Sequence, residues 1–184
     1  FLAYVAGRTS RIRIGHGVVC LPFPMNHPVK VAERVAMLDI LSNGRVDFGI
    51  GKGGTAQEAG AFQTKMEEIP DQLEFSGRLI PKMWLSEYFE HESELMTIPR
   101  RPIIPKPHQD PHPPMYLPCT RESTLNQAGE WGLGALVLGF AGPEDIAQKN
   151  RVYRAAVARR TPKSQMGAFP VEHLSALCPA IVLD

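Results

Sequence analysis

Strand-like and helix-like apolar patterns alternate along almost the whole chain, and this alternation constrains the fold more than any other feature. Residues 11–21 begin with strict alternation and end almost wholly apolar, which is typical of a strand that is half buried at one end and fully buried at the other. A helix is predicted from Pro28 to the glycine at position 44, because apolar residues recur about one turn apart between them. Residues 45–50 alternate again and predict a second strand.

The same order continues to the end of the chain. The further predicted strands are 115–119, 134–140 and 176–184, and the predicted helices between them are 123–131 and 143–160. No two consecutive strands are joined by a tight hairpin, so we expect a parallel sheet. A closed barrel and a doubly wound open sheet both satisfy this order, and both place ligands beyond the carboxyl ends of the strands.

Two segments interrupt the pattern. Gly77 and Pro81 fall within a helical stretch, and we expect a kink there because proline lacks an N–H donor and clashes with the preceding turn. Residues 88–114 are rich in proline and predict an irregular surface insertion. We expect one domain over residues 1–184, truncated at both ends, because Phe1 begins what looks like the tail of a helix.

Composition excludes several classes of protein. The chain is 43% hydrophobic and 21% charged with a net charge of +1, without the charge blocks typical of nucleic-acid or membrane binding. Cys20, Cys119 and Cys178 lie far apart, so we expect neither a zinc site nor a disulfide framework and place the protein in the cytoplasm. Cys20 and Cys119 are interpreted as small buried residues. His108 and His112 have no partner cluster, and no metal site is predicted.

A glycine cluster follows the second predicted strand. Residues 49–54 read GIGKGG, which lacks the G-x-G-x-x-G spacing of a dinucleotide-binding turn, and no helix opens at its third glycine. A dinucleotide site is therefore disfavoured.

Five ordered blocks resemble the bacterial luciferase-like family of flavin-dependent monooxygenases. These blocks are residues 9–19, 27–33, 38–53, 111–116 and 122–132. The resemblance implies an α/β fold, a TIM (β/α)8 barrel, of which this chain would carry approximately strands 3 to 7 with their helices. A complete barrel of this kind needs about 250 residues, so the barrel is expected to be incomplete.

The resemblance also implies where the flavin binds. A non-prolyl cis peptide between Gly17 and Val18 would end the third barrel strand and support the isoalloxazine ring, with His16 beside it. The alternative is that Gly15 and Gly17 only relieve crowding in the strand.

Further residues are expected around the flavin phosphate. Lys52 and Gly53 follow the fourth barrel strand, where the lysine either neutralises the phosphate or is simply solvated. The segment after the fifth strand opens a helix, and helix N-termini bind anions; ordinary capping by Ser123 is the alternative. Its candidate residues are Thr120, Arg121, Ser123 and Thr124. Leu138 and Gly139, at the end of the sixth strand, would lie near the flavin.

By the resemblance, the protein is a monooxygenase that uses O2 and reduced FMN, supplied by a separate flavin reductase, to oxygenate a small organic substrate. The alternatives are a deazaflavin-dependent oxidoreductase of the same superfamily and a non-catalytic flavin-binding barrel fragment. No catalytic residue is predicted. We expect a dimer that binds neither nucleic acid nor membrane, and we expect the fragment alone to be inactive.

Overall fold

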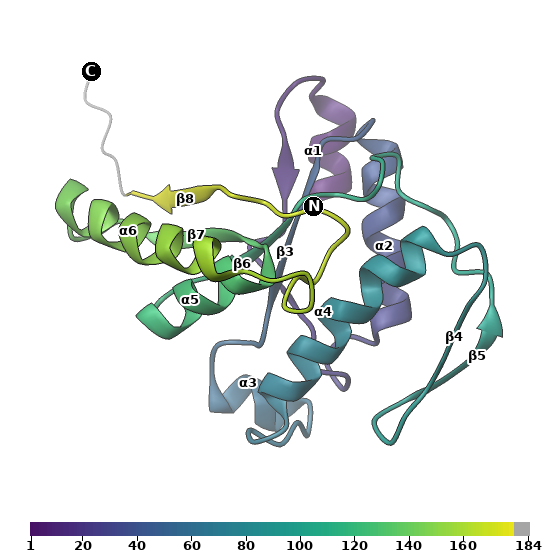
Figure 1. The fold of residues 1–184 in the computed structure, drawn as a ribbon. Helices are drawn as coiled ribbons and strands as arrows, with labels where there is room; N and C mark the ends of the chain where they lie inside the picture. Colours follow the sequence, from purple (N-terminus) through teal and green to yellow (C-terminus); the bar gives the residue numbers. More distant parts are fainter. Residues whose placement is uncertain (179–184) are drawn as a thin grey trace. The chain divides into compact units, whose positions relative to one another are not determined.

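The computed structural model describes residues 1–178 of the 184-residue chain. The chain divides into two compact units, Phe1–Pro113 and Pro114–Asp184. Figure 1 shows the order of the elements along the chain.

Three short parallel strands form the sheet of the first unit. Strands β1 (Ile14–Gly15) and β2 (Val19–Cys20) both pair with β3 (Val46–Gly51). The single strand expected over residues 11–21 is therefore wrong, because the chain leaves the ladder between β1 and β2. The peptide bond from Gly17 to Val18 is cis, as predicted.

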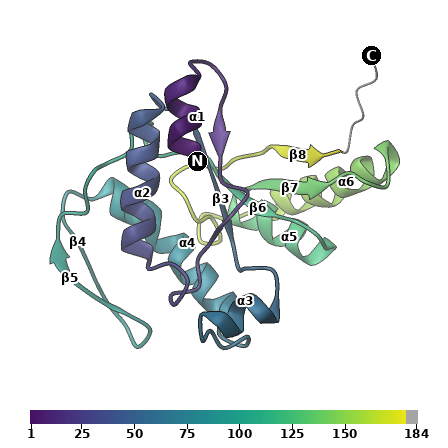
Figure 2. The same cartoon turned by 180° about the vertical axis from the view of Figure 1, so that it is seen from behind.

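Four helices accompany this sheet. They are α1 (Leu2–Arg8), α2 (Pro28–Leu41), α3 (Ala56–Ala61) and α4 (Ile69–Leu85). Helices α2 and α4 contact each other and β3, as Figure 2 shows from behind. Helix α2 begins at its proline, as expected, and the Nδ1 atom of His27 accepts a hydrogen bond from the Val29 N–H at 3.3 Å.

Helix α4 continues through both residues that were expected to interrupt it. Gly77 and Pro81 lie inside its 17 residues. Both are buried, and the helix also buries Trp84, whose indole N–H donates to the carbonyl of Ala32 on α2 at 3.0 Å. Proline inside a helix costs about 3 kcal/mol, and burial of this apolar face offsets that cost.

The proline-rich segment contains a hairpin that the sequence did not predict. Strands β4 (Phe89–Glu92) and β5 (Thr97–Arg101) pair antiparallel, so the expectation of an irregular segment without a hairpin is wrong. Pro99 is tolerated because each strand of a two-stranded ribbon has an unpaired edge. The ring of His91 lies 5.1 Å from that of Phe75, which joins the hairpin to α4.

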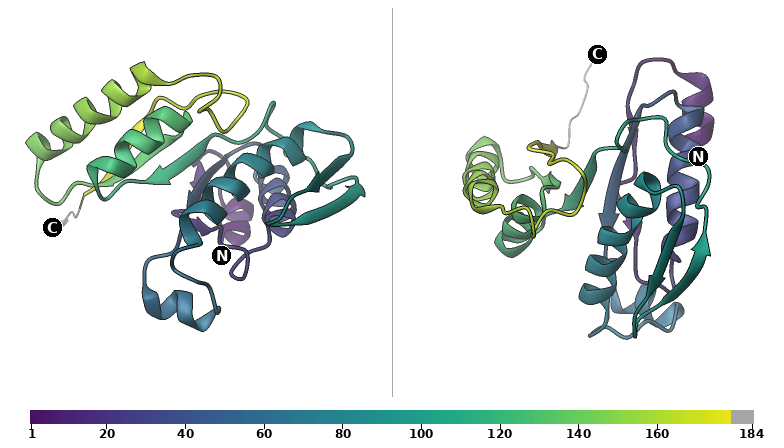
Figure 3. Two further views of the ribbon diagram at one scale, coloured as in Figure 1. Left: turned by 60° about the horizontal axis from the view of Figure 1, so that its bottom comes forward. Right: turned by 45° about the vertical axis from the view of Figure 1, so that its right-hand side comes forward.

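The second unit has three parallel strands. The order is β6 (Met115–Pro118), β7 (Gly134–Leu138) and β8 (Leu174–Leu177). Helices α5 (Glu122–Trp131) and α6 (Pro143–Arg159) lie side by side, as the left view of Figure 3 shows. They come close at Gly129, where a Cβ atom would lie 2.6 Å from the Cβ of Ala156. The last predicted strand, 176–184, lies mostly outside the described residues.

Tyr153 is the largest fully buried side chain among residues 1–178, and replacing it with phenylalanine is expected to cost about 1–2 kcal/mol of unfolding free energy. Its hydroxyl lies 2.9 Å from the carbonyl oxygen of Leu133 and 2.8 Å from that of Val171, and both buried acceptors lose this partner in the variant. Urea unfolding measures the change. Tyr4→Phe is the control, because Tyr4 is 70% exposed. Equal stability of the two variants would contradict the prediction.

Candidate functional site

The segment His16–Val18 bulges from the sheet against two glycines of β3. A Cβ atom on Gly49 would lie 2.0 Å from the backbone oxygen of His16, and one on Gly51 would lie 2.3 Å from Cγ2 of Val18. At Gly49 the Cβ atom would meet the main chain, so only glycine admits the bulge there, whereas at Gly51 the side chain of Val18 would have to move. The glycine cluster of residues 49–54, disfavoured as a dinucleotide-binding turn, therefore shapes this bulge.

Gly15 and Gly17 were alternatively explained by crowding within the strand, and this explanation fits only Gly15. A Cβ atom on Gly15 would lie 3.1 Å from the backbone oxygen of Asp47 on the neighbouring strand. At Gly17, by contrast, a Cβ atom would meet nothing within 4 Å among the described residues, and the glycine is exposed. Gly17 therefore borders open space next to the cis bond.

A cavity of about 350 Å³ lies beside the bulge. It is lined by His16, Val18, Val19, Cys20, Met25, Asn26, Val31, Arg34, Val35, Glu58 and Phe62. The Nδ1 atom of His16 is buried and has no hydrogen-bond partner among the described residues. Burial, and then the positive charge of Arg34, lowers the pKa of His16, so its imidazole is neutral at pH 7.

The loop after β3 is organised by Glu58, a residue that the sequence-based prediction missed. Its Oε2 atom accepts a hydrogen bond from the Gly54 N–H at 2.9 Å, and the Thr55 hydroxyl caps α3 by accepting from the Glu58 N–H at 3.0 Å. Threonine followed three residues later by glutamate is the signal that identifies such a helix start. Lys52 is exposed beside this loop, and Gly53 has a φ of +87°.

The two cysteines interpreted as buried differ in their surroundings. Cys20 is half-buried in the cavity wall, 4.0 Å from Oε1 of Glu58, and burial and then that carboxylate raise the pKa of its thiol. Cys119 is fully buried, as predicted, and burial raises its pKa to about 12. Burial thus keeps both thiols protonated at neutral pH, which disfavours a nucleophilic role.

In the second unit, the N-terminus of α5 collects four of the predicted site residues. Thr120, Arg121 and Ser123 are exposed, and Thr124 is half-buried. The N-cap residue is Arg121, whose N–H donates to the Thr124 hydroxyl at 3.2 Å. The alternative, capping by Ser123, is therefore wrong, because the hydroxyl of Thr124 accepts from the N-cap N–H instead.

This arrangement leaves groups that suit an anion. The first N–H groups of a helix have no partner within it, and the helix dipole adds a partial positive charge there. The guanidinium of Arg121 has no hydrogen bond or ion pair with any residue of 1–178. The N-terminus of α5 is thus a candidate phosphate site.

The two residues predicted near the flavin at the end of β7 differ in exposure. Leu138 is 42% exposed, whereas Gly139 is buried. A Cβ atom on Gly139 would lie 2.7 Å from Sγ of Cys178 and 2.9 Å from Cδ1 of Ile146. Close packing within this unit therefore accounts for the glycine.

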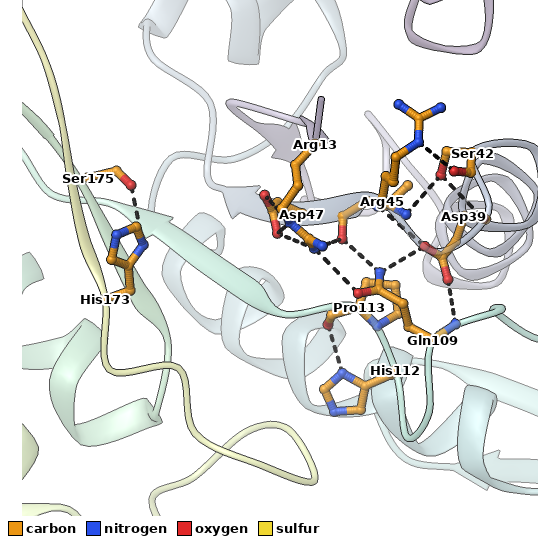
Figure 4. A network of polar contacts seen from close by, with 11 residues as sticks. Arg13, Asp39, Ser42, Arg45, Asp47, Gln109, His112, Pro113, His173 and Ser175 are labelled. Carbon is orange, nitrogen blue, oxygen red and sulfur yellow. Dashed lines mark hydrogen bonds and ion pairs between the residues drawn. The ribbon is translucent and has the colours of Figure 1, made fainter. Parts of the chain in front are cut away.

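A polar network, which no sequence signal indicated, lies at the beginning of β3 (Figure 4). Arg13 binds both carboxylate oxygens of Asp47, with a shortest distance of 2.7 Å. Gln109 donates to the buried carboxylate of Asp39 and to the carbonyl of Val46. The network ties the proline-rich segment to α2 and β3, at the end of the strand remote from the bulge.

Residues 1–178 contain neither a candidate metal centre nor a candidate membrane-spanning helix. No group of three or more His, Cys, Asp or Glu side chains there is arranged to hold a metal ion. No helix in that range is long and apolar enough to cross a membrane.

Residues 1–179 match the profile of the luciferase-like monooxygenase family. Over 118 residues the chain is 35% identical to the oxygenase component of the flavin-dependent trigonelline monooxygenase of Acinetobacter baylyi, covering 63% of this chain and 32% of that protein. It is 29% identical to the F420-dependent glucose-6-phosphate dehydrogenase of Amycolatopsis mediterranei, covering 79% of this chain and 44% of the relative. The chain thus spans less than half the length of these relatives.

Solved structures show the same fold. The monooxygenase RslO1 of Streptomyces bottropensis superposes with a TM-score of 0.75 at 28% identity, covering 88% of this chain and 50% of that one. The oxygenating constituent of 3,6-diketocamphane monooxygenase of Pseudomonas putida, solved with FMN, gives a TM-score of 0.72 at 21% identity, with 88% and 48% covered. The predicted fold class, an incomplete (β/α)8 barrel, is confirmed.

Proposed function

Because this chain belongs to the luciferase-like monooxygenase family, we propose that it forms part of a flavin-dependent monooxygenase that oxygenates a small organic substrate with O2 and reduced FMN. The observation that carries the proposal is the bulge at His16–Val18, which closes on Gly49 and Gly51 of β3. It lies at the carboxyl end of a parallel strand, where barrel enzymes bind their ligands. The oxygenase-component relative supports a separate reductase as the source of reduced flavin.

Each unit by itself offers residues that suit one part of FMN. In the first unit, Gly17 is exposed and borders open space, so the backbone of the bulge is accessible to a flat ring. In the second unit, the N-terminus of α5 and the guanidinium of Arg121, which pairs with no described residue, suit a phosphate group. Thr120 and Ser123 add exposed hydroxyls at the same helix end.

FMN, when bound, supplies the redox chemistry with oxygen, and the chain's own residues hold it and shape its surroundings. The bulge positions the ring, and Val18 and Met25 provide apolar surface that excludes water beside it. His16 is neutral at pH 7 because burial and Arg34 lower its pKa, so it offers the ring a neutral imidazole. That Lys52, Leu138 and Gly139 lie near the flavin remains a prediction.

Arg121→Gln is expected to weaken FMN binding by about tenfold or more, because a charge-assisted hydrogen bond to phosphate contributes about 1.5–3 kcal/mol. Riboflavin, which has the same ring and no phosphate, should bind both proteins equally. Quenching of flavin fluorescence on titration measures the dissociation constants. The matched control is Arg151→Gln, because Arg151 lies on α6 and bonds only to Gln148 among the described residues. Equal weakening of FMN and riboflavin, or no change in either, would refute the phosphate role.

A deazaflavin-dependent oxidoreductase is the second candidate, favoured by the relative that uses F420. Anaerobic titration with reduced FMN and with F420 distinguishes the two, because the cofactor used should bind more tightly. A third possibility, a non-catalytic flavin-binding fragment, predicts binding without oxygenation of any substrate. The dimer and the cytoplasmic location stay predictions.

A further inference from the structure

We propose that the cavity beside the bulge binds a small, largely apolar organic acid, whose carboxylate group contacts Arg34. This inference rests on the proposed function, because it takes the acid to be the substrate of the monooxygenase. The cavity volume of about 350 Å³ lies within the range of small-molecule sites. One wall is the bulge itself, so a molecule bound here lies next to the place proposed for the flavin ring.

Arg34 is the positive group among the residues that line the cavity, and it pairs with no carboxylate of residues 1–178. Its Nε atom donates to the backbone oxygen of Lys30 and its Nη2 atom to Oδ1 of Asn26. Among the described residues no ion pair includes it. The two bonds hold the guanidinium in one orientation while further N–H donors remain for a ligand, and the planar fork of arginine matches a carboxylate.

The remaining polar groups favour a singly charged anion. His16 stays neutral, because burial and Arg34 lower its pKa, so it adds no second positive charge. The carboxylate of Glu58 lines the same cavity, bonded to the Gly54 N–H. Because the lining carries one guanidinium and one carboxylate, it repels a doubly charged phosphate more strongly than a monoanion.

The apolar lining selects the rest of the molecule. Val18, Val31, Val35, Met25 and Phe62 share the walls. Val31 and Val35 are almost fully buried, so they offer a fixed surface, whereas Met25 adapts its shape. An aromatic or branched aliphatic acid therefore fits the cavity better than a sugar or a polyol.

Fluorine NMR of 4-fluorobenzoate with the 184-residue chain tests the proposal without any flavin. The acid is expected to bind saturably, and about tenfold or more tighter than 4-fluorobenzamide, which has the same shape and no charge. Arg34→Gln should remove the difference between acid and amide. Arg8→Gln is the matched control, because Arg8 is exposed on α1 and does not line the cavity.

A second variant guards against a folding effect. Asn26→Asp leaves Arg34 in place and sets a negative charge beside its guanidinium, so it should also weaken binding of the acid more than binding of the amide. Equal affinity for acid and amide, or unchanged binding in Arg34→Gln, overturns the proposal. So does displacement of the acid by inorganic phosphate at equal or lower concentration, which would make the cavity a phosphate site. None of these measurements uses flavin, so each can be interpreted even if the protein does not bind FMN.

Discussion

Gly49→Ala is expected to destabilise the protein by at least about 3 kcal/mol, at or above the upper end of ordinary overpacking costs. The new Cβ atom would lie 2.0 Å from the backbone oxygen of His16 and 3.1 Å from its carbonyl carbon. Both are main-chain atoms, so relief requires that the bulge move away from β3 as a whole. Flavin binding should fall with stability, because the bulge is the proposed support of the ring.

Alanine substitutions at two other glycines, Gly51 and Gly54, serve as comparisons for this prediction. Gly51→Ala places its Cβ atom 2.3 Å from a methyl group of Val18, a side chain that can rotate, so a smaller loss is expected. Gly54→Ala meets nothing within 4 Å among the described residues and should change stability by less than about 1 kcal/mol. Urea unfolding of the three variants measures the order. Equal stability of the Gly49 and Gly54 variants would show that the bulge does not need the glycine.

Asp39→Ala is expected to cost about 3 kcal/mol or more, because each buried donor left without a partner costs about 1–3 kcal/mol. Asp39 is fully buried on α2. Its Oδ2 accepts from the Gln109 N–H at 2.8 Å, and its Oδ1 accepts from Gln109 Nε2 at 2.8 Å and from the Val46 N–H at 3.3 Å. Loss of the carboxylate frees the proline-rich segment from α2 and leaves three N–H bonds without this acceptor, while the bond from Gln109 Nε2 to the Val46 carbonyl remains.

A double-mutant cycle with Gln109→Ala isolates this interaction. The two side chains are expected to couple by about 0.5–3 kcal/mol, since removal of either partner breaks the same hydrogen bond. Asp71→Ala is the control, because Asp71 is exposed in the first turn of α4 and should cost less than about 1 kcal/mol. Strictly additive losses for Asp39 and Gln109 would contradict the coupling.

The sequence by itself determined the elements whose signals are local. Helix α2 begins at Pro28, and helix α6 begins at Pro143, as predicted, because capping and periodicity depend on neighbours within a few residues. Strand β3 also lies where alternation placed it. The family blocks further predicted the cis bond between Gly17 and Val18 and the barrel fold.

Only the tertiary structure decided what depends on distant partners. Strand pairing with β3 divides the expected strand 11–21 in two, and the glycine that admits the bulge lies more than 30 residues further along the chain. The cavity joins Arg34 of α2 to Glu58 of α3, and Asp39 meets Gln109 from the proline-rich segment. Periodicity reports which face of an element is buried and not what it is buried against, so the sequence located the bulge and the fold supplied its surroundings.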